Sequence, residues 1–297
     1  MKRLGRLLTA MVTPFDAGGE VDYEQARKLA LALISSGSDG VVIAGTTGES
    51  PTLLRKEELR LFRELKAVLG TRGTVIAGTG SNSTAEAREA TRQAEETGVD
   101  ACLLVVPYYN KPSQEGLYQH FKTIAQGTSL PCILYNVPSR TVANLSADTV
   151  IRLSQIDNIV GIKEASGNFE QIARIVSGTP DDFTVWSGND SDTLFLLSLG
   201  GYGVISVISH LVGKQVKEMM SSFASGRIDE ATSIHHRLLP LNNALFAIAN
   251  PMPVKYALNL LGFQVGKPRL PLVEPDEKTA ALIRDTLQSY TIDLPLA

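Results

Sequence analysis

The sequence predicts an α/β fold, namely a (β/α)8 TIM barrel with a C-terminal helical appendage. Short apolar runs recur at an even pitch, and amphipathic stretches with helix-capping signals separate them. The runs do not alternate strictly between apolar and polar residues, which is typical of parallel strands covered on both faces by crossover helices. A barrel needs eight strand-helix units, and eight fit into the first part of the chain.

The predicted strands are 7–12, 40–45, 74–79, 102–107, 132–136, 159–165, 184–188 and 203–208. Helix starts follow several of them. Ser83 with Glu86 predicts a capping box, and Asp22 with Gln25 and Asn168 with Gln171 repeat that spacing. A doubly wound sheet is the alternative, but no G-x-G-x-x-G opens the first helix, and "GTGSNS" at 78–83 matches that motif only in part.

The pattern changes after residue 222, beyond which only amphipathic helices are expected. Residues 1–222 are therefore predicted to form the barrel that carries the active site, and residues 223–297 a C-terminal helical domain. In this second part, "NPMPVKYALNLLGF" places two prolines before an apolar helix, which predicts a bend and no catalytic motif.

Composition excludes several function classes. The 297 residues include 28 basic and 31 acidic ones, with no basic block suited to nucleic acid. Arg6 interrupts the apolar start, which argues against a signal peptide. No apolar run reaches membrane-spanning length. Cys102 and Cys132 lie in apolar runs, which is typical of reduced, buried thiols. We therefore expect a cytoplasmic protein that binds neither nucleic acid nor membrane. The four histidines lack metal-ligand spacing, so no metal site is expected.

The stretch "NIVGIKEAS", residues 158–166, places Lys163 in an apolar run that otherwise resembles a buried strand. A lysine at a strand end usually extends to solvent or pairs with a carboxylate. Strand alternation puts Gly161 on the same face as Lys163 and Glu164 on the opposite face. Gly161 is therefore expected to leave room beside the amine, and Glu164 to face the helices.

Barrel active sites lie at the carboxyl ends of the strands, where this chain has "GTTGES" (45–50), "PYYNKPS" (107–113), "YNVPSR" (135–140), "KEAS" and "SGND" (187–190). The Gly-Thr-Thr-Gly turn suits a carboxylate or phosphate oxygen. Alternatively, Thr47 or Ser50 caps the next helix. The turn lacks the Gly-Lys of a P-loop, so no nucleotide cofactor is expected.

Three tyrosines, Tyr108, Tyr109 and Tyr135, lie at two of these strand ends, either as core aromatics or as proton carriers. Arg140 is either a surface residue or a bidentate clamp for a substrate carboxylate. A lysine among hydroxyls indicates Schiff-base catalysis on a carbonyl compound. Because the ordinary lysine pKa is about 10.4, this chemistry requires desolvation of the amine, which an apolar strand end supplies.

The motifs "GTTGESPTL", "PYYNKPSQEGLYQHF", "LYNVPSRT" and "GIKEASGN" resemble the dihydrodipicolinate synthase family, a branch of the pyruvate-dependent Schiff-base lyases and aldolases, and the resemblance covers essentially the whole chain. It implies that pyruvate condenses with aspartate 4-semialdehyde through a lysine imine, in diaminopimelate and lysine biosynthesis. No further cofactor is implied. The residue roles that the resemblance implies are the imine at Lys163, proton transfer at Tyr135 linked through Thr46 to Tyr109, the pyruvate carboxylate at Thr47, the semialdehyde carboxylate at Arg140, and pocket walls at Gly188 and Ile205.

The resemblance also implies a homotetramer built from tight dimers, in which Tyr109 reaches into the neighbouring subunit. Lysine-inhibited members carry an effector site to which Ser50, Asn82, Glu86 and Tyr108 correspond here. This chain departs from them at three positions, Arg55 and Glu58, which replace histidines, and Pro51, which replaces a smaller residue. The departures favour weak or absent feedback by lysine.

Two other functions are weighed against this one. A sugar-acid aldolase, such as N-acetylneuraminate lyase or a 2-keto-3-deoxy-sugar-acid aldolase, shares the lysine and its tyrosine. Arg140 and the doubled Tyr108-Tyr109 argue against it, because a sugar chain needs hydroxyl-binding partners rather than a carboxylate clamp. A non-catalytic barrel has little use for an amine at a desolvated strand end.

Overall fold

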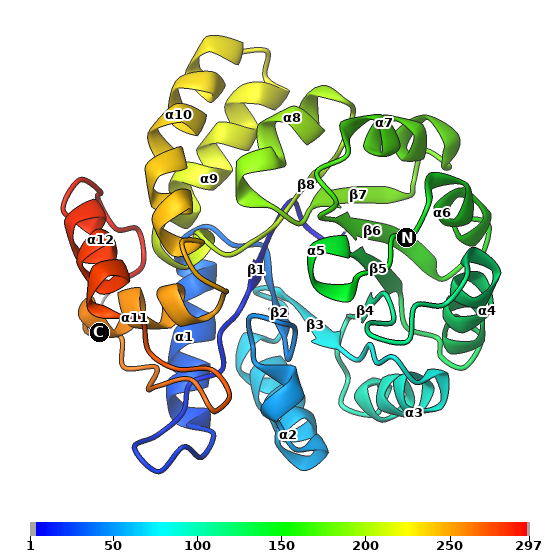
Figure 1. Cartoon of the computed structure of the whole chain (residues 1–297), viewed down its shortest axis with the longest axis horizontal. Helices are drawn as coiled ribbons and strands as arrows, with labels where there is room; N and C mark the ends of the chain where they lie inside the picture. Colours follow the sequence, from blue (N-terminus) through cyan, green and yellow to red (C-terminus); the bar gives the residue numbers. More distant parts are fainter. Residues whose placement is uncertain (1–3, 296–297) are drawn as a thin grey trace.

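The computed structural model describes residues 4–295, and in this range eight parallel strands close into a barrel in sequence order (Figure 1). The predicted fold class is confirmed. The strands are β1 Leu7–Ala10, β2 Gly40–Ile43, β3 Thr74–Gly78, β4 Ala101–Val105, β5 Cys132–Asn136, β6 Ile159–Glu164, β7 Thr184–Ser187 and β8 Gly203–Ser206. All but β5 end one or two residues before their predicted ends, because the chain turns out of the ladder there. Ala44, just after β2, already has a φ of 53°.

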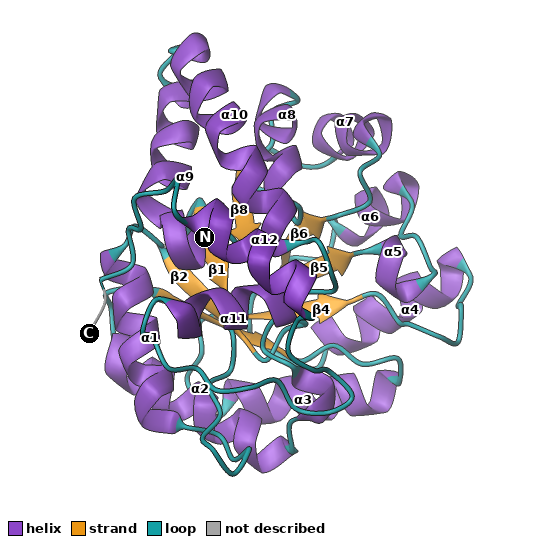
Figure 2. Ribbon diagram, turned by 60° about the vertical axis from the view of Figure 1, so that its left-hand side comes forward, coloured by secondary structure: helices purple, strands orange, loops and turns teal. Residues whose placement is uncertain are grey.

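Helices surround the barrel, so that each parallel strand is covered on its outer face (Figures 1 and 2). In the barrel part they are α1 Tyr23–Ser35, α2 Arg55–Leu69, α3 Thr84–Glu95, α4 Gln114–Ala125, α5 Pro138–Thr141, α6 Ala147–Leu153, α7 Phe169–Gly178, α8 Thr193–Ser198 and α9 Ser209–Ala224, with short 3-10 turns at Ser50–Thr52 and Asp190–Asp192.

The predicted helix caps are present, with one correction. The side chains of Asp22, Ser83 and Asn168 each accept a hydrogen bond from the backbone N–H three residues on. The capping box predicted for Ser83 and Glu86 is wrong in its second half. The Glu86 carboxylate accepts from the Ser81 hydroxyl at 2.9 Å, and the Ser83 backbone N–H donates to that same hydroxyl oxygen.

The barrel interior is filled by side chains from alternate positions of the strands, as in a packed core rather than a pore. Trp186 of β7 is the bulkiest of them and is almost fully buried, with its indole N–H donating to the Gly5 carbonyl. A Cβ at Gly161 would lie 2.2 Å from the Thr184 carbonyl oxygen and 2.7 Å from the Trp186 ring. The expectation that Gly161 leaves room beside the amine is therefore wrong, since the Trp186 indole and strand β7 fill that space.

The C-terminal part contains α10 Ile228–Leu245, α11 Met252–Leu260 and α12 Glu277–Leu287, as the amphipathic pattern predicts. These helices lie beside α9 and α1 (Figure 1). One cluster of buried apolar side chains runs from the outer face of β1 and β2 through α9 into α10 and α11. The predicted boundary at residue 222 falls inside the last turn of α9, and the division into two domains stays a prediction.

The sequence predicts neither a membrane-spanning segment nor a metal site, and two observations on the described residues bear on these predictions. None of their helices combines the length and apolar character needed to cross a membrane. No group of three or more histidine, cysteine or acidic side chains among them is placed to hold a metal ion. Cys102 and Cys132 are free, buried thiols on the neighbouring strands β4 and β5, with their sulfur atoms 3.4 Å apart.

We expect His210, at the start of α9, to make the stability of the folded chain sensitive to acid. Its ring accepts from the Val12 backbone N–H at 3.2 Å and contacts the Val207 carbonyl at 2.8 Å. Burial lowers its pKa from 6.5 to about 4, so the unfolded chain takes up a proton first as the pH falls. Between pH 7.5 and 5.0 this costs the native state about 2 kcal/mol. Urea unfolding of the wild type and His210→Gln at both pH values should show the smaller loss in the variant, and equal losses would contradict this assignment.

Candidate functional site

Lys163 and Tyr135 meet at the mouth of the barrel because β5 and β6 are neighbours and these two residues are partners in register. Both side chains are buried, at 5% and 7% exposure. The Lys163 amine lies 4.4 Å from the centre of the Tyr135 ring. Within residues 4–295, Lys163 takes part in no salt bridge with a carboxylate. The two residues that the sequence places at the centre of the chemistry are therefore brought together.

Glu164 faces outward from β6, as strand alternation predicts. Its carboxylate accepts hydrogen bonds from the Ser166 backbone N–H at 2.7 Å, the Asn136 amide at 3.1 Å and the Gln171 amide at 3.3 Å. Burial raises the pKa of Glu164, and these hydrogen bonds oppose the rise. The carboxylate next in sequence to Lys163 therefore serves the contact between β6 and α7 and does not pair with the amine.

Gly188, just after β7, is the glycine that makes room for Lys163. A Cβ there would lie 2.6 Å from the Ala165 Cβ and 3.2 Å from the Lys163 Cε. Ile205 of β8 lies in the same interior cluster and is buried. Their role as walls of the substrate pocket stays a prediction.

Asp190 lies in the predicted strand-end motif "SGND" but was not predicted to have a side-chain role. Its carboxylate accepts from the backbone N–H groups of Val207 and Ile208, at 2.8 and 3.2 Å, and so holds the turn that follows β8. Burial raises the pKa of Asp190, while its hydrogen bonds and the positive charge of Lys163 lower it. Asp190 is thus a buried carboxyl group close enough to Lys163 to sense its charge.

The Gly-Thr-Thr-Gly turn after β2 brings Thr46 and Thr47 to the same mouth. Thr47 is buried, and its hydroxyl oxygen accepts from the Asn250 side-chain amide at 2.8 Å. The alternative in which Thr47 or Ser50 caps the next helix is wrong, because α2 begins at Arg55 with Leu54 at its N-cap position. The turn is therefore free to serve the site.

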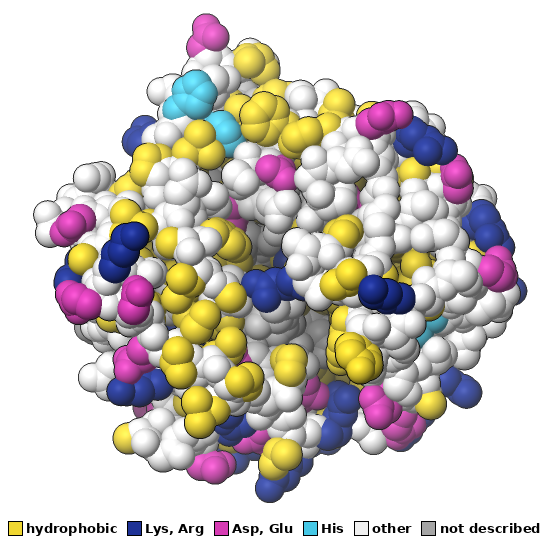
Figure 3. Space-filling model, viewed as in Figure 1, with side chains coloured by type: hydrophobic (Ala, Val, Ile, Leu, Met, Phe, Trp, Pro, Cys, Tyr) yellow, Lys and Arg dark blue, Asp and Glu magenta, His cyan; other side chains and the backbone are white. Residues whose placement is uncertain are grey.

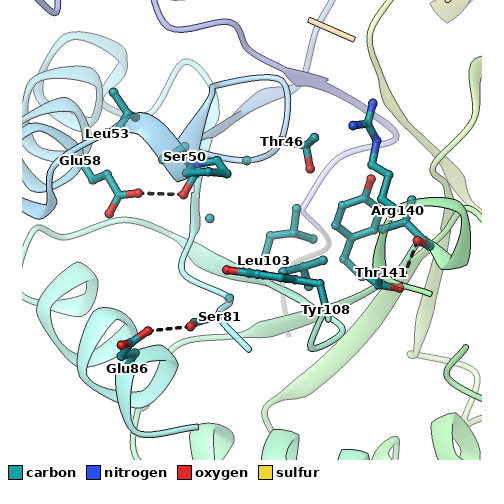
Figure 4. A pocket seen from close by; sticks show the side chains of 18 of the residues that line it. Thr46, Ser50, Leu53, Glu58, Ser81, Glu86, Leu103, Tyr108, Arg140 and Thr141 are labelled. Atoms are coloured by element: carbon teal, nitrogen blue, oxygen red, sulfur yellow. Dashed lines mark hydrogen bonds between the residues drawn. The ribbon is translucent and has the colours of Figure 1, made fainter. Parts of the chain in front are cut away.

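A cavity of about 400 Å³ opens beside these residues and has two ends (Figure 4). Thr46 and Arg140 lie at one end, and Tyr135 is also among the lining residues. Ser50, Glu58 and Glu86 line the other, and Tyr108 lies between the two groups. Arg140 comes from the short helix α5, and its guanidinium donates to the Asn250 carbonyl at 3.2 Å. The cavity thus connects Arg140 to most of the predicted effector residues, whereas Lys163, Thr47, Gly188 and Ile205 are not among the residues that line it.

The predicted effector residues form separate hydrogen-bonded groups around the second end of the cavity. The Glu58 carboxylate pairs with the Arg55 guanidinium at 2.5 Å and accepts from the Ser50 hydroxyl at 2.9 Å. Burial raises the pKa of Glu58, against the lowering effect of Arg55. On the facing loop, the Asn82 amide donates to the Tyr108 carbonyl at 3.1 Å.

Tyr109 is separated from the other predicted catalytic residues in this chain. Its side chain is 88% exposed, its φ is 76°, and it does not line the cavity. Tyr108 is 40% exposed. The alternative that treats this pair as core aromatics is therefore wrong, and Tyr109 presents its ring to solvent.

Sequence reasoning missed the residues through which the C-terminal part contacts the Thr47 turn. Glu49 is 1% exposed, and its carboxylate binds the Lys255 amine at 2.8 Å and the Arg269 backbone N–H at 2.9 Å. Arg269 also binds Glu57 of α2 through two hydrogen bonds. Asn250 follows α10 in the stretch predicted to hold no catalytic motif. Nothing in the local pattern marks these contacts, since their partners are some 200 residues apart in sequence.

Nearly the whole chain matches the model of one protein family. The model of the dihydrodipicolinate synthetase family matches residues 3–290. The chain belongs to this family. A relative from Dehalococcoides mccartyi, named 4-hydroxy-tetrahydrodipicolinate synthase, is 67% identical over 296 residues and covers 100% of both chains. The family resemblance expected from the strand-end motifs is confirmed.

Solved structures of the family have the same fold. A dihydrodipicolinate synthase from Bacillus anthracis is 46% identical with a TM-score of 0.96, covering 98% of this chain and 100% of its own. One from Cyanidioschyzon merolae, solved with lysine bound, is 50% identical with a TM-score of 0.95, covering 96% and 98%. A variant described as the first monomeric dihydrodipicolinate synthase is 44% identical with a TM-score of 0.94, covering 96% of both chains.

Proposed function

We propose that this chain is a lyase that condenses pyruvate with L-aspartate 4-semialdehyde to give 4-hydroxy-tetrahydrodipicolinate, in diaminopimelate and lysine biosynthesis. The observation that carries the proposal is the buried Lys163 amine at the end of β6, beside Tyr135 and without a carboxylate partner among the described residues. Full-length relatives named for this reaction support it. They do not support the sugar-acid aldolase alternative.

The Schiff base forms when the Lys163 nitrogen attacks the keto carbon of pyruvate and water leaves. Loss of a methyl proton converts the imine to an enamine, whose carbon attacks the aldehyde carbon of the second substrate, while the aldehyde oxygen takes a proton. The amine of that substrate then attacks the imine carbon, closes the ring and displaces Lys163. The lysine supplies the electron sink, so we propose that no metal or nucleotide cofactor takes part.

Tyr135 is the proposed carrier of the protons in these steps, because its ring lies against the Lys163 amine and it also lines the cavity. Thr46 lines the same end and is the proposed link from Tyr135 to Tyr109. Gly188, next to the Lys163 side chain, and Ile205, in the barrel interior, are the proposed pocket walls. Burial in this apolar surrounding keeps competing water away from the imine.

Two carboxylates must be held at once, and the site offers a separate group for each. Thr47 is the proposed ligand of the pyruvate carboxylate, on the turn whose backbone approaches the barrel mouth. Arg140 is the proposed ligand of the semialdehyde carboxylate, and its guanidinium can grip that group through two parallel hydrogen bonds. A sugar chain has no carboxylate for Arg140 at this position. We also infer a cytoplasmic location, in line with a pyruvate-consuming biosynthetic reaction.

The roles of Lys163 and of the aldehyde can be tested together. Borohydride reduction in the presence of pyruvate should leave a mass adduct on the peptide that contains Lys163, and Lys163→Met should lose both the adduct and measurable turnover. Lys255 of the same wild-type chain is the internal control, because this second buried lysine pairs with Glu49, away from the imine, and should carry no adduct. Turnover with a sugar aldehyde but not with the semialdehyde would favour the aldolase alternative.

We also propose a homotetramer built as a dimer of dimers. A hydrophobic surface near two histidines, over α8 and α10, supports a contact between subunits (Figure 3). In this surface the ring centroids of Phe169 and Phe195 are 5.5 Å apart. The Phe195 ring also packs edge-to-face against the His235 ring, with 5.7 Å between the centroids. The exposed Tyr109 ring supports a second contact, through which it would complete the neighbouring subunit's relay. The monomeric variant among the solved structures makes the oligomeric state a matter for measurement.

Tyr109→Phe tests the relay across the subunit contact. We expect the variant to lose most of its kcat, on the order of ten- to a hundredfold, because the phenol that carries the proton is gone. Its oligomeric state, measured by analytical ultracentrifugation, should match the wild type, since the ring remains. Full turnover in a variant that still assembles would remove Tyr109 from the relay.

Feedback by lysine is proposed to be weak or absent. The effector end of the cavity already holds an internal ion pair, Arg55 with Glu58, and Ser50 donates to the same carboxylate. A lysine ligand would have to compete with these contacts for the groups that would bind it. The Cyanidioschyzon merolae structure has lysine bound, so the fold itself does not prevent such a site.

Initial rates measured against L-lysine test this regulatory proposal. We expect little inhibition at submillimolar lysine in the wild type. Arg55→His combined with Glu58→His removes the internal ion pair and should increase the sensitivity to lysine. Half-maximal inhibition of the wild type by submillimolar lysine would contradict the proposal.

A further inference from the structure

Asn250 lies outside the barrel, between α10 and α11, yet it contacts both proposed carboxylate ligands. Its side-chain amide donates to the Thr47 hydroxyl oxygen at 2.8 Å, and its backbone carbonyl accepts from the Arg140 guanidinium at 3.2 Å. It is 6% exposed. One residue of the C-terminal part therefore connects the two groups that must bind different substrates.

The direction of the bond between Asn250 and Thr47 determines what the threonine can offer a substrate. A threonine hydroxyl has one hydrogen and can accept as well as donate. Because the Asn250 N–H2 group donates to the hydroxyl oxygen, the single hydroxyl hydrogen stays available. A carboxylate such as that of pyruvate can only accept, so this orientation suits it.

The other end of the Asn250 amide indicates that the residue is not there for stability. Its Oδ1 is buried and has no hydrogen-bond partner in the described residues. A buried acceptor left without a partner destabilises the folded state, whereas an apolar side chain of similar size would not. The amide is therefore a poor choice for packing alone.

The segment that carries Asn250 is anchored next to the Thr47 turn, at Glu49 and at Thr13. Lys255, one turn into α11, donates to Glu49 at 2.8 Å and to the Thr13 carbonyl at 3.0 Å. Arg269 donates its backbone N–H to the same Glu49 carboxylate at 2.9 Å. Asn250 therefore has a fixed position relative to Thr47, as a positioning residue needs.

We propose that Asn250 is a positioning residue for the condensation. Its amide orients the Thr47 hydroxyl hydrogen toward the pyruvate carboxylate, and its carbonyl holds the Arg140 guanidinium in place for the second carboxylate. This inference rests on the proposed function, because it assumes that Thr47 and Arg140 bind those groups.

Asn250→Asp is the decisive variant, because it keeps the size of the side chain and reverses the direction of its hydrogen bond with the Thr47 hydroxyl. An aspartate accepts the Thr47 hydrogen and so withdraws it from pyruvate. We expect the KM for pyruvate to rise about tenfold, the loss of one hydrogen bond to a charged group. Asn250→Leu only frees the hydroxyl to rotate and should raise the same KM less, with no loss of thermal stability. In a Thr47→Val background, Asn250→Asp should add less than a twofold change.

Asn259→Asp is the matched control, since this amide lies in the same segment and, among residues 4–295, its hydrogen bonds go to Gly266 and Val265 alone. It should lower thermal stability and leave the KM for pyruvate unchanged. The inference is overturned if Asn250→Asp shifts that KM less than twofold, or if the shift persists in the Thr47→Val background. Borohydride trapping of wild-type Lys163 distinguishes a failure of the proposed function from a failure of this inference alone. With no adduct the proposed function fails, whereas an adduct with an unchanged KM in Asn250→Asp removes only this inference.

Discussion

The register between neighbouring strands at the barrel mouth is the constraint on which the site depends. Parallel strands that pair in register carry their side chains at one level, so Lys163 of β6 has Tyr135 of β5 on one side and Trp186 of β7 on the other. The indole fills the interior below the mouth, and Gly161 lets it do so. Gly188 leaves the remaining space along the lysine side chain. The amine is thereby enclosed without a pocket having to be built for it from loops.

Strand alternation solves a second problem, that of a glutamate next to a reactive lysine. Glu164 points to the outer layer, where Asn136, Ser166 and Gln171 donate hydrogen bonds to its carboxylate. A two-residue period thus separates the Lys163 amine from its nearest carboxylate in sequence. The carboxylate that does sense Lys163 is Asp190, whose hydrogen bonds are used to hold the turn after β8.

The C-terminal helices are part of the site rather than an attachment to it. The buried pair between Lys255 and Glu49 links α11 to the turn after β2, and both side chains are almost fully enclosed. Removing one partner of such a pair leaves an uncompensated charge, at a cost of roughly 3–5 kcal/mol. Arg269 continues the connection to Glu57 of α2. The turn that carries Thr46 and Thr47 is in this way held by both the barrel and the C-terminal helices.

The sequence by itself determined the strand-helix repeat, the face on which Glu164 lies and the family, because periodicity, capping signals and strand-end motifs are local properties. It also predicted that Lys163 and Tyr135 meet, since every parallel strand of a barrel ends at the same mouth. Only the tertiary structure decided which atoms fill the space at Gly161, where Tyr109 points, and that Asn250 and Lys255 reach the Thr47 turn. Those outcomes depend on packing between segments far apart in the chain, and no local pattern records which segments will meet.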